Sequence, residues 1–207
     1  MDDVEYRGVV WERQSEWRNY SVRLGAGIPS KDSGVGALLG LDLPLAANTS
    51  AGLDPCISWV APGEWLVSAS RAPNVLFDRL RCAISGTLGH VADLSSGLAV
   101  YRMAGKGSRD FLTRGCSIDV HPRSFPAGAC ARTLFAGVPV LLRARGGEFQ
   151  IVCELSFSVY LEQWSERVRG HLEASRNATE SPLFGGRIGT FERARGGSYA
   201  SRDPSIV

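Results

Sequence analysis

The amino-acid sequence predicts an α+β domain with antiparallel or mixed sheets and helices packed on one face. Segments with strand-like alternation recur along the chain, and segments with apolar residues at helical spacing lie between them. In the second half, three strand-like segments follow one another with only two or three turn residues between them. Connections this short join antiparallel strands, so the pattern favours an α+β sheet over a doubly wound parallel sheet.

The N-terminal segment is predicted to be a polar arm, residues 1–30. Its first part mixes charged residues with Trp11 and Trp17, which is typical either of a frayed terminus or of a segment that docks on a partner through aromatic anchors. Residues 31–55 are expected to begin with a short glycine-rich helix and to continue as a loop after Pro44.

A strand hairpin and a helix are expected next. Residues 56–60 and 64–70 read as paired strands, because Ala-Pro-Gly between them is a turn sequence. Pro73 is placed to open a helix that runs to about Ile84, since apolar residues recur on one face at helical spacing.

Two more strands and a second helix follow in the middle of the chain. Residues 89–95 and 98–105 are predicted strands joined by a Ser-Ser-Gly turn. Ser108 is placed to act as the N-cap of a helix that ends at Gly115, where a glycine favours a left-handed stop.

The second half is predicted to be a run of hairpins closed by a long helix. Residues 129–135, 138–144 and 148–155 are the three expected strands. The helix is expected over about residues 157–172, because its apolar residues lie at positions i, i+3, i+4, i+7 and i+11.

The charge distribution separates a neutral body from a basic tail. Residues 1–175 carry 18 basic and 18 acidic residues, whereas residues 176–207 carry 5 and 3. The predicted domain, residues 31–175, therefore has no concentrated basic footprint, and a nucleic-acid partner is not expected. The tail is rich in Gly, Arg and Ser without a period, so it is predicted to be mobile or ordered only by a partner.

The cysteines and the N-terminus indicate a cytoplasmic protein. The 5 cysteines are odd in number and form no C-x-x-C pair, which favours free thiols in a reducing compartment. The first residues are charged and lack the apolar core of a signal peptide. No run approaches the roughly 18 apolar residues that a membrane span needs.

No cluster of reactive side chains stands out. Cys116 and His121 are the nearest pair for nucleophilic or zinc chemistry, and nothing completes a set. The glycines from Gly34 to Gly40 lack the spacing of a dinucleotide loop, and the A-G-K-G-S stretch at 104–108 fails the Walker A pattern. No residue is therefore predicted to be catalytic, to bind a cofactor or to ligate a metal.

Four short motifs occur in a characteristic order. They are G-E-W-L at 63–66, D-L-S-S at 93–96, G-C-S-I-D-V-H-P at 115–122, and S-F at 156–157 ahead of Trp164. Over about residues 35–170 the chain resembles the gamma subunits of heterotetrameric sarcosine oxidases. The segment from Val91 to Leu112 resembles, more distantly, a strand-turn-strand-helix element of folate-dependent aminomethyltransferases. The resemblance thus implies an aminomethyltransferase-like folate-binding fold.

The resemblance also implies a function. It implies a non-catalytic structural subunit of a bacterial, flavin-dependent complex of sarcosine catabolism, an oxidoreductase acting on CH–NH donors. The complex would oxidise an N-methyl amino acid or a related secondary amine. The expected partners are alpha, beta and delta subunits. FAD, FMN, NAD and tetrahydrofolate are expected in the alpha and beta subunits and zinc in delta, with no cofactor in this chain.

A second hypothesis makes the chain an independent folate-binding or aminomethyl-transfer module. Such a module needs a carboxylate that faces the folate, and Asp93 is the candidate. The alternative for Asp93, and for Arg102, is a structural role. Asp93 then organises the turn at Ser95 and Ser96 through its side chain, and Arg102 extends from the middle of its strand to solvent. Glu154 and Glu162 depart from the family pattern. This leaves open that the complex acts on a different substrate, such as another secondary amine.

Overall fold

The structure is a computed structural model that describes residues 8–25 and 34–179, with side chains described up to residue 170. The chain forms two compact units, residues 1–171 and residues 172–207. Both sheets that the described residues form lie in the first unit. Of the second unit the structure describes only residues 172–179, which are the C-terminal end of helix α4 (Ser158–Thr179).

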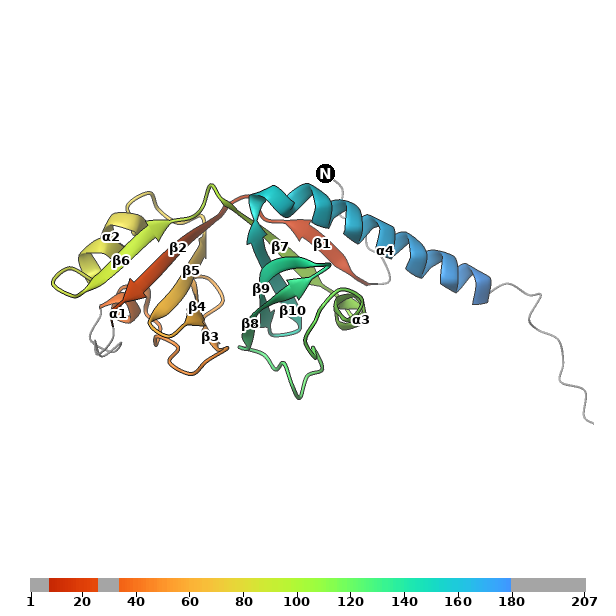
Figure 1. The fold of residues 1–207 in the computed structure, drawn as a ribbon, viewed down its shortest axis with the longest axis horizontal. Coiled ribbons are helices and arrows are strands. Elements are labelled where there is room, and N and C mark those ends of the chain that lie inside the picture. The colour runs from red at the N-terminus through yellow and green to blue at the C-terminus, as the bar shows by residue number, and fades with distance from the viewer. Residues whose placement is uncertain (1–7, 26–33, 180–207) are drawn as a thin grey trace, which may run out of the picture. The chain divides into compact units, whose positions relative to one another are not determined.

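Ten strands in the described ranges form two antiparallel sheets of five strands each (Figure 1), which confirms the predicted α+β class. The first sheet has the order β3 (Ser50–Ala51), β4 (Cys56–Ala61), β5 (Glu64–Ser70), β2 (Trp17–Leu24) and β6 (Gly89–Asp93). The second sheet has the order β1 (Val10–Arg13), β7 (Leu98–Ala104), β10 (Glu148–Glu154), β9 (Val138–Arg145) and β8 (Cys130–Phe135).

Helices cover one face of each sheet. Figure 1 shows α1 and α2 beside the first sheet, and α3 and the start of α4 beside the second. None of the helices in the described ranges has the length and apolar character that a membrane-spanning helix needs. The helices are α1 (Val35–Leu39), α2 (Leu76–Ala83), α3 (Ser108–Thr113) and α4, which follows the short 3₁₀ turn η2 (Leu155–Phe157).

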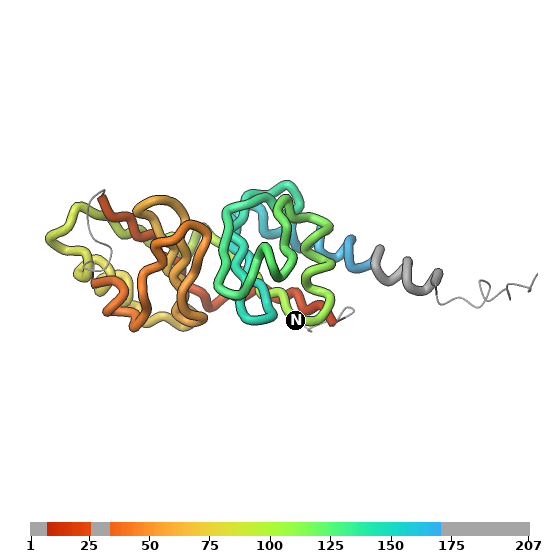
Figure 2. The backbone as a smooth tube through the Cα atoms, turned by 90° about the horizontal axis from the view of Figure 1, so that it is seen from below, coloured from red at the N-terminus to blue at the C-terminus, as the bar shows by residue number. Residues whose placement is uncertain are grey.

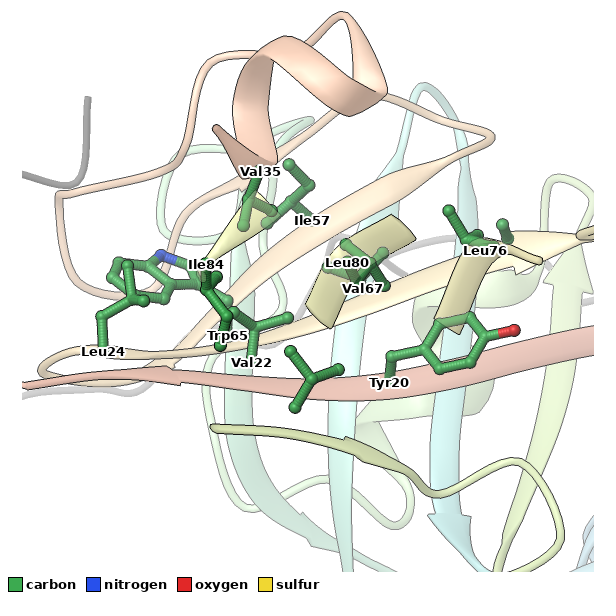
Figure 3. Close-up of a cluster of buried hydrophobic side chains, with 12 residues drawn as sticks. Tyr20, Val22, Leu24, Val35, Ile57, Trp65, Val67, Leu76, Leu80 and Ile84 are labelled. Carbon is green, nitrogen blue, oxygen red and sulfur yellow. The ribbon is translucent and has the colours of Figure 1, made fainter. Parts of the chain in front are cut away.

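The core of the first sheet lies between α2 and the face of the sheet that α2 covers, which is called the outer face below. Alternate residues of β2 point to this face, and they meet Val67 of β5 and Leu80 of α2 (Figure 3). Tyr20 and Val22 are buried there, as is Leu80. Each such side chain contributes on the order of 2 kcal/mol by leaving water.

The core of the second sheet is aromatic. The Trp11 ring stacks on Tyr101 with their centroids 4.9 Å apart. Trp164 of α4 meets Phe135 and Phe111 edge-on, at 5.0 and 5.6 Å. Edge-to-face and stacked pairs at these separations stabilise the packing beyond the area they bury.

The predicted N-terminal arm is wrong for residues 10–24, which supply β1 and β2. The two strands lie in different sheets, where β1 pairs with β7 and β2 runs between β5 and β6. Trp11 and Trp17 therefore pack inside the molecule instead of serving as exposed anchors. Residues 1–7 and 26–30 of the predicted arm lie outside the described residues.

Two details of the helices also differ from the prediction. The N-cap of α3 is Gly107, and the Ser108 hydroxyl donates backwards to the Gly105 carbonyl at 2.7 Å. Helix α4 continues to Thr179, four residues into the predicted tail that begins at residue 176. The rest of that tail, residues 180–207, lies outside the described residues.

The two sheets pack against each other through their inner faces. Trp17 and Leu66 of the first sheet form a buried cluster with Val100, Leu141 and Val152 of the second. The chain just before β3 also pairs with the chain at the start of β8, where the isolated bridge Thr49–Ala129 lies (Figure 2). A sandwich with helices outside follows from these contacts.

Candidate functional site

The largest concentration of buried polar side chains lies between the two sheets. Cross-strand partners on one face lie side by side, and the register pairs Arg143 with Gln150 in the second sheet and Ser68 with Asn19 in the first. All four side chains are essentially inaccessible to solvent. We refer to Asn19, Ser68, Arg143 and Gln150 as the polar layer.

A continuous set of hydrogen bonds runs through the polar layer and joins the sheets. The Arg143 guanidinium donates from Nη1 to Gln150 Oε1 at 2.7 Å and from Nη2 to Ser68 Oγ at 2.8 Å. The Ser68 hydroxyl in turn donates to Asn19 Oδ1 at 2.8 Å. Gln150 Nε2 donates to Gln14 Oε1 at 3.2 Å, which carries the set toward the surface.

The polar layer contains a positive charge that no described carboxylate neutralises. No ion pair in the described part of the chain involves Arg143, and its Nε atom has no hydrogen-bond acceptor. Burial lowers the pKa of the Arg143 guanidinium, although an arginine stays protonated in proteins. An unpaired buried charge is costly, so its two hydrogen bonds are essential to the packing of the sheets.

Two buried thiols, Cys130 beside the polar layer and Cys153 elsewhere in the second sheet, are unsuited to nucleophilic chemistry. Burial raises the pKa of Cys130 to about 11, even though the Arg143 charge acts in the opposite direction. Burial also raises the pKa of Cys153 to about 11. A thiol with such a pKa is protonated at neutral pH, and the thiolate is the reactive form.

The pair Cys116 and His121 does not form a reactive site in the described structure. Cys116 forms an isolated bridge with Phe135, whereas His121 is exposed and its Nδ1 accepts from the Arg123 backbone at 3.3 Å. Nowhere in the described ranges do three or more His, Cys, Asp or Glu side chains gather as metal ligands would.

Asp93 organises its turn, as the folding argument predicts. Its Oδ1 atom accepts from the Ser95 backbone at 2.8 Å and from the Ser95 hydroxyl at 2.5 Å. Arg102 keeps 33% of its side chain exposed, as expected for an arginine that reaches solvent. It also pairs with Glu148 at 2.5 Å and Glu12 at 3.5 Å, which ties three neighbouring strands together.

The glycine-rich stretches serve local backbone geometry. The stretch from Gly34 to Gly40 contains the five-residue helix α1, and its two terminal glycines adopt left-handed conformations that favour glycine. Gly105 lies against the Gly8 carbonyl, where a Cβ atom would be 1.4 Å from the oxygen. Neither stretch presents the geometry of a nucleotide-binding loop.

An open groove of about 710 Å³ lies where the start of β8 meets the chain before β3. Its one carboxylate, Asp119, accepts from the His121 backbone at 2.8 Å and from the Ser124 hydroxyl at 2.5 Å. These bonds lower the pKa of Asp119, so it is ionised and already hydrogen-bonded at neutral pH. The groove therefore offers a surface rather than an acid–base pair.

A second, polar depression of about 560 Å³ lies around Trp17. Several of its charged groups already have partners within the chain. Arg71 Nε lies 2.6 Å from Glu16 Oε2, Asp54 accepts from the Ser70 backbone at 2.9 Å, and the Arg145 guanidinium lies 5.1 Å from the centre of the Trp17 ring. Such a set holds loops in place and leaves no carboxylate poised for proton transfer.

Two residues acquire roles that the sequence did not reveal. Arg143 follows Leu141 on the inner face of β9, and this pattern does not distinguish a buried arginine from one that reaches solvent. Glu162, one of the departures from the family pattern, accepts from the Tyr101 hydroxyl at 2.8 Å and lies 3.7 Å from Arg13. Glu162 thus fastens α4 to the second sheet.

Comparison with known proteins yields one family. The model of the sarcosine oxidase, gamma subunit family matches residues 23–170. The sarcosine oxidase subunit gamma of Corynebacterium sp. (strain U-96) is 32% identical over 131 residues, which cover 62% of this chain and 63% of that protein. The subunit gamma of an Arthrobacter sp. is 30% identical over 131 residues, 62% of this chain and 64% of that protein. The chain thus spans a little under two thirds of these relatives.

Solved structures share the fold. A chain of the heterotetrameric sarcosine oxidase from Corynebacterium sp. U-96, in complex with pyrrole 2-carboxylate, superimposes with a TM-score of 0.73 at 27% identity, over 80% of this chain and 86% of that one. The glycine cleavage system aminomethyltransferase T from Bartonella henselae gives a TM-score of 0.56 at 10% identity, over 78% of this chain and 46% of that one. The second likeness concerns the fold alone, and it agrees with the aminomethyltransferase-like fold expected from the sequence.

Proposed function

The chain belongs to the sarcosine oxidase gamma subunit family, and on that premise we propose that it is a non-catalytic structural subunit of a heterotetrameric, flavin-dependent oxidase. The polar layer is the observation that carries the proposal. Its buried polar side chains, which in an enzyme would face a substrate, bond to one another across the two sheets. The molecule therefore serves by shape and by contact with other polypeptides.

The reaction of the proposed complex is the oxidation of an N-methyl amino acid or a related secondary amine. We place FAD, FMN, NAD and tetrahydrofolate in alpha and beta subunits and zinc in a delta subunit. The raised pKa values of Cys130 and Cys153 and the internal bonding of Asp93 support a chain without chemistry of its own. Glu162 accepts a hydrogen bond from Tyr101 inside this subunit, so we assign this residue a packing role rather than a role in the choice of substrate.

Co-purification tests the proposed assembly. The tagged chain is co-expressed with its alpha, beta and delta partners, and the eluate is examined by native mass spectrometry and by its flavin absorbance. We expect one complex with a single copy of this chain and with flavin bound to the partners. Elution of this chain without any flavoprotein subunit would reject the assembly.

The alternative, an independent folate-binding or aminomethyl-transfer module, is favoured only by the fold shared with aminomethyltransferase T. Its candidate residue, Asp93, already accepts two hydrogen bonds from Ser95. Calorimetry with tetrahydrofolate and the isolated chain decides between the two functions. Binding that disappears in Asp93→Asn supports the module, and absence of binding at millimolar folate supports the structural subunit.

A further inference from the structure

We infer that the outer edge of β6 is a docking site for a β-strand of a partner subunit. The inference rests on the proposed function and adds to it the surface that makes one of the subunit contacts. Three properties of β6 support it: the direction of its free backbone groups, the exposed leucines at its two ends, and less protection than the other sheet edges have.

The hydrogen bonds of β6 to β2 fix which of its backbone groups are free. Leu94 N donates to Asn19 O at 2.8 Å at one end of the strand, and Gly25 N donates to Leu88 O at 2.7 Å at the other. In an antiparallel ladder every second residue bonds to the same neighbour. Residues 88, 90, 92 and 94 therefore face β2.

The alternate residues of β6 face outward. The N–H and C=O groups of Gly89, Val91 and Asp93 point away from β2, and no residue in the described ranges forms a backbone hydrogen bond with them. Three donors and three acceptors in a row match the backbone of one extended segment, which is how a strand is added to a sheet edge.

Apolar side chains mark both ends of this edge. Leu88 is 80% exposed, the largest value among the bulky apolar side chains of the described residues, and Leu94 is 37% exposed. A strand that adds to β6 would cover both leucines. At about 3.3 Å per residue they lie roughly 20 Å apart, so the occupant is an extended segment of about seven residues with an apolar side chain near each end.

The other sheet edges in the described structure are short, charged or covered. Strand β3 has only two residues, and β1 ends in Glu12 and Arg13. Strand β8 is covered at both ends by the bridges Thr49–Ala129 and Cys116–Phe135. Proteins use these devices to prevent unwanted pairing.

Strand β6 has less of this protection. It ends in one charged residue, Asp93, whose carboxylate bonds to Ser95, but its sequence, Gly-His-Val-Ala-Asp, has no Lys, Arg or Pro, and its register with β2 has no bulge. An uncovered, regular edge is the expected form of an edge that pairs with another polypeptide. Because the proposed assembly contains one copy of this chain, the occupant belongs to a different subunit.

The test compares charged variants of the two leucines with a matched control. Leu88→Lys combined with Leu94→Lys places two positive charges at the edge, whereas Leu53→Lys changes a leucine that is 61% exposed and lies in the loop before β4. Each variant is co-expressed with the alpha, beta and delta subunits, and the yield of the complex is compared with that of the unmodified chain. We expect at least a tenfold loss for the double variant and no loss for the control.

Hydrogen–deuterium exchange gives a second readout that does not depend on a variant. We expect the amides of Gly89, Val91 and Asp93 to exchange rapidly in the isolated chain and at least tenfold more slowly in the complex. Unchanged exchange at these three amides, or full assembly of the double variant, would overturn the docking site. If the unmodified chain fails to assemble, the proposed function itself fails. A homodimer of the isolated chain that the double variant abolishes would assign the edge to a second copy instead.

Discussion

At the scale of single residues, Arg143 is the side chain on which the packing of the sheets depends most. It is fully buried, it spans the two sheets through Ser68 and Gln150, and it carries a charge that no described carboxylate balances. A planar guanidinium can bond in two directions at once, which a lysine ammonium on a flexible stem cannot reproduce in the same space. The structure therefore requires arginine, not merely a cation, at this position.

Replacement of Arg143 by lysine tests this requirement. We expect Arg143→Lys to lower the free energy of unfolding by about 3 kcal/mol near neutral pH, measured by urea denaturation. Burial depresses the pKa of the new lysine below its unfolded value, so the unfolded state binds more protons. The stability of the variant relative to the unmodified chain should then rise from about pH 6 to about pH 9.

The control for that experiment removes the charge altogether. Arg143→Met keeps the length of the side chain, and we expect its loss of stability to be smaller than that of the lysine variant and independent of pH over the same range. Equal stability of the lysine variant and the unmodified chain would show that the guanidinium is not buried between the sheets.

The cysteines give a prediction about reactivity. Cys82 is exposed, whereas burial raises the pKa values of Cys130 and Cys153 to about 11. An alkylating reagent applied to the native chain at about pH 8 should modify Cys82 and leave Cys130 and Cys153 intact, as read by peptide mass spectrometry. Labelling of Cys130 at a rate similar to Cys82 would contradict the protected position of that thiol.

The same thiols affect stability in alkaline solution. Their folded pKa values of about 11 lie above the ordinary value of 9.0, so the unfolded chain loses these protons first as the pH rises. Above about pH 9 the folded state binds more protons than the unfolded state, and the free energy of unfolding falls. Cys130→Ala should make this decline shallower in denaturation curves collected from about pH 8 to about pH 10.5.

At the scale of elements, the contact of α4 with the second sheet depends on a glycine. A Cβ atom at Gly115 would lie 2.7 Å from the Trp164 ring and 3.1 Å from the Ala136 nitrogen. We expect Gly115→Ala to displace Trp164 and to lower the free energy of unfolding by about 2 kcal/mol, measured by tryptophan fluorescence during urea denaturation. Gly97→Ala is the matched control, since its nearest neighbour would be 3.7 Å away, and it should change stability little.

The same glycine illustrates what the sequence could and could not reveal. Gly115 was predicted to end α3 in a left-handed conformation, but α3 ends at Thr113 and Gly115 is not among the residues with positive φ. Its role is the close approach of the Trp164 ring from a distant helix. Local sequence rules describe the chain around a residue, and they contain no information about a side chain that arrives from elsewhere in the fold.

Strand prediction succeeded where alternation and turns coincide. The segments that became β4 to β10 were found to within one or two residues at each end, because apolar alternation is regular and turn residues separate them. Strand β2 was missed because its apolar and polar residues do not alternate along the whole strand. Arg18 interrupts the alternation, Arg23 adds charge to a segment that reads as a polar arm, and the buried Asn19 of the polar layer looks like a surface residue in the sequence. Its neighbours β5 and β6 come from later parts of the chain, and they determine that it is a strand.

The polar layer could not be predicted for a related reason. Ser68, Asn19, Arg143 and Gln150 come from four strands, and each is unremarkable where it stands in the sequence. The sequence alone predicts no catalytic cluster. The hydrogen bonds among these four side chains become visible only when the two sheets are brought together.

At the scale of the whole molecule, the first unit is a pair of sheets with helices on their outer faces and a polar layer between them. The fold, without regard to its side chains, is shared with a chain of heterotetrameric sarcosine oxidase and with an aminomethyltransferase. A fold shared by proteins of different activity does not determine function, so the proposal of a structural subunit depends on the side chains and the family. The open outer edge of β6, which a strand of a partner subunit could cover, agrees with the proposal of a structural subunit.

The most direct test of the central claim is amine-dependent flavin reduction, measured in parallel for the isolated chain and for the complete assembly. We expect the isolated chain to retain no flavin and to show no turnover of sarcosine or of another N-methyl amino acid, while the assembly that contains it oxidises the substrate. Turnover by the isolated chain, or a flavin that stays bound to it through gel filtration, would contradict the account of a subunit without chemistry of its own.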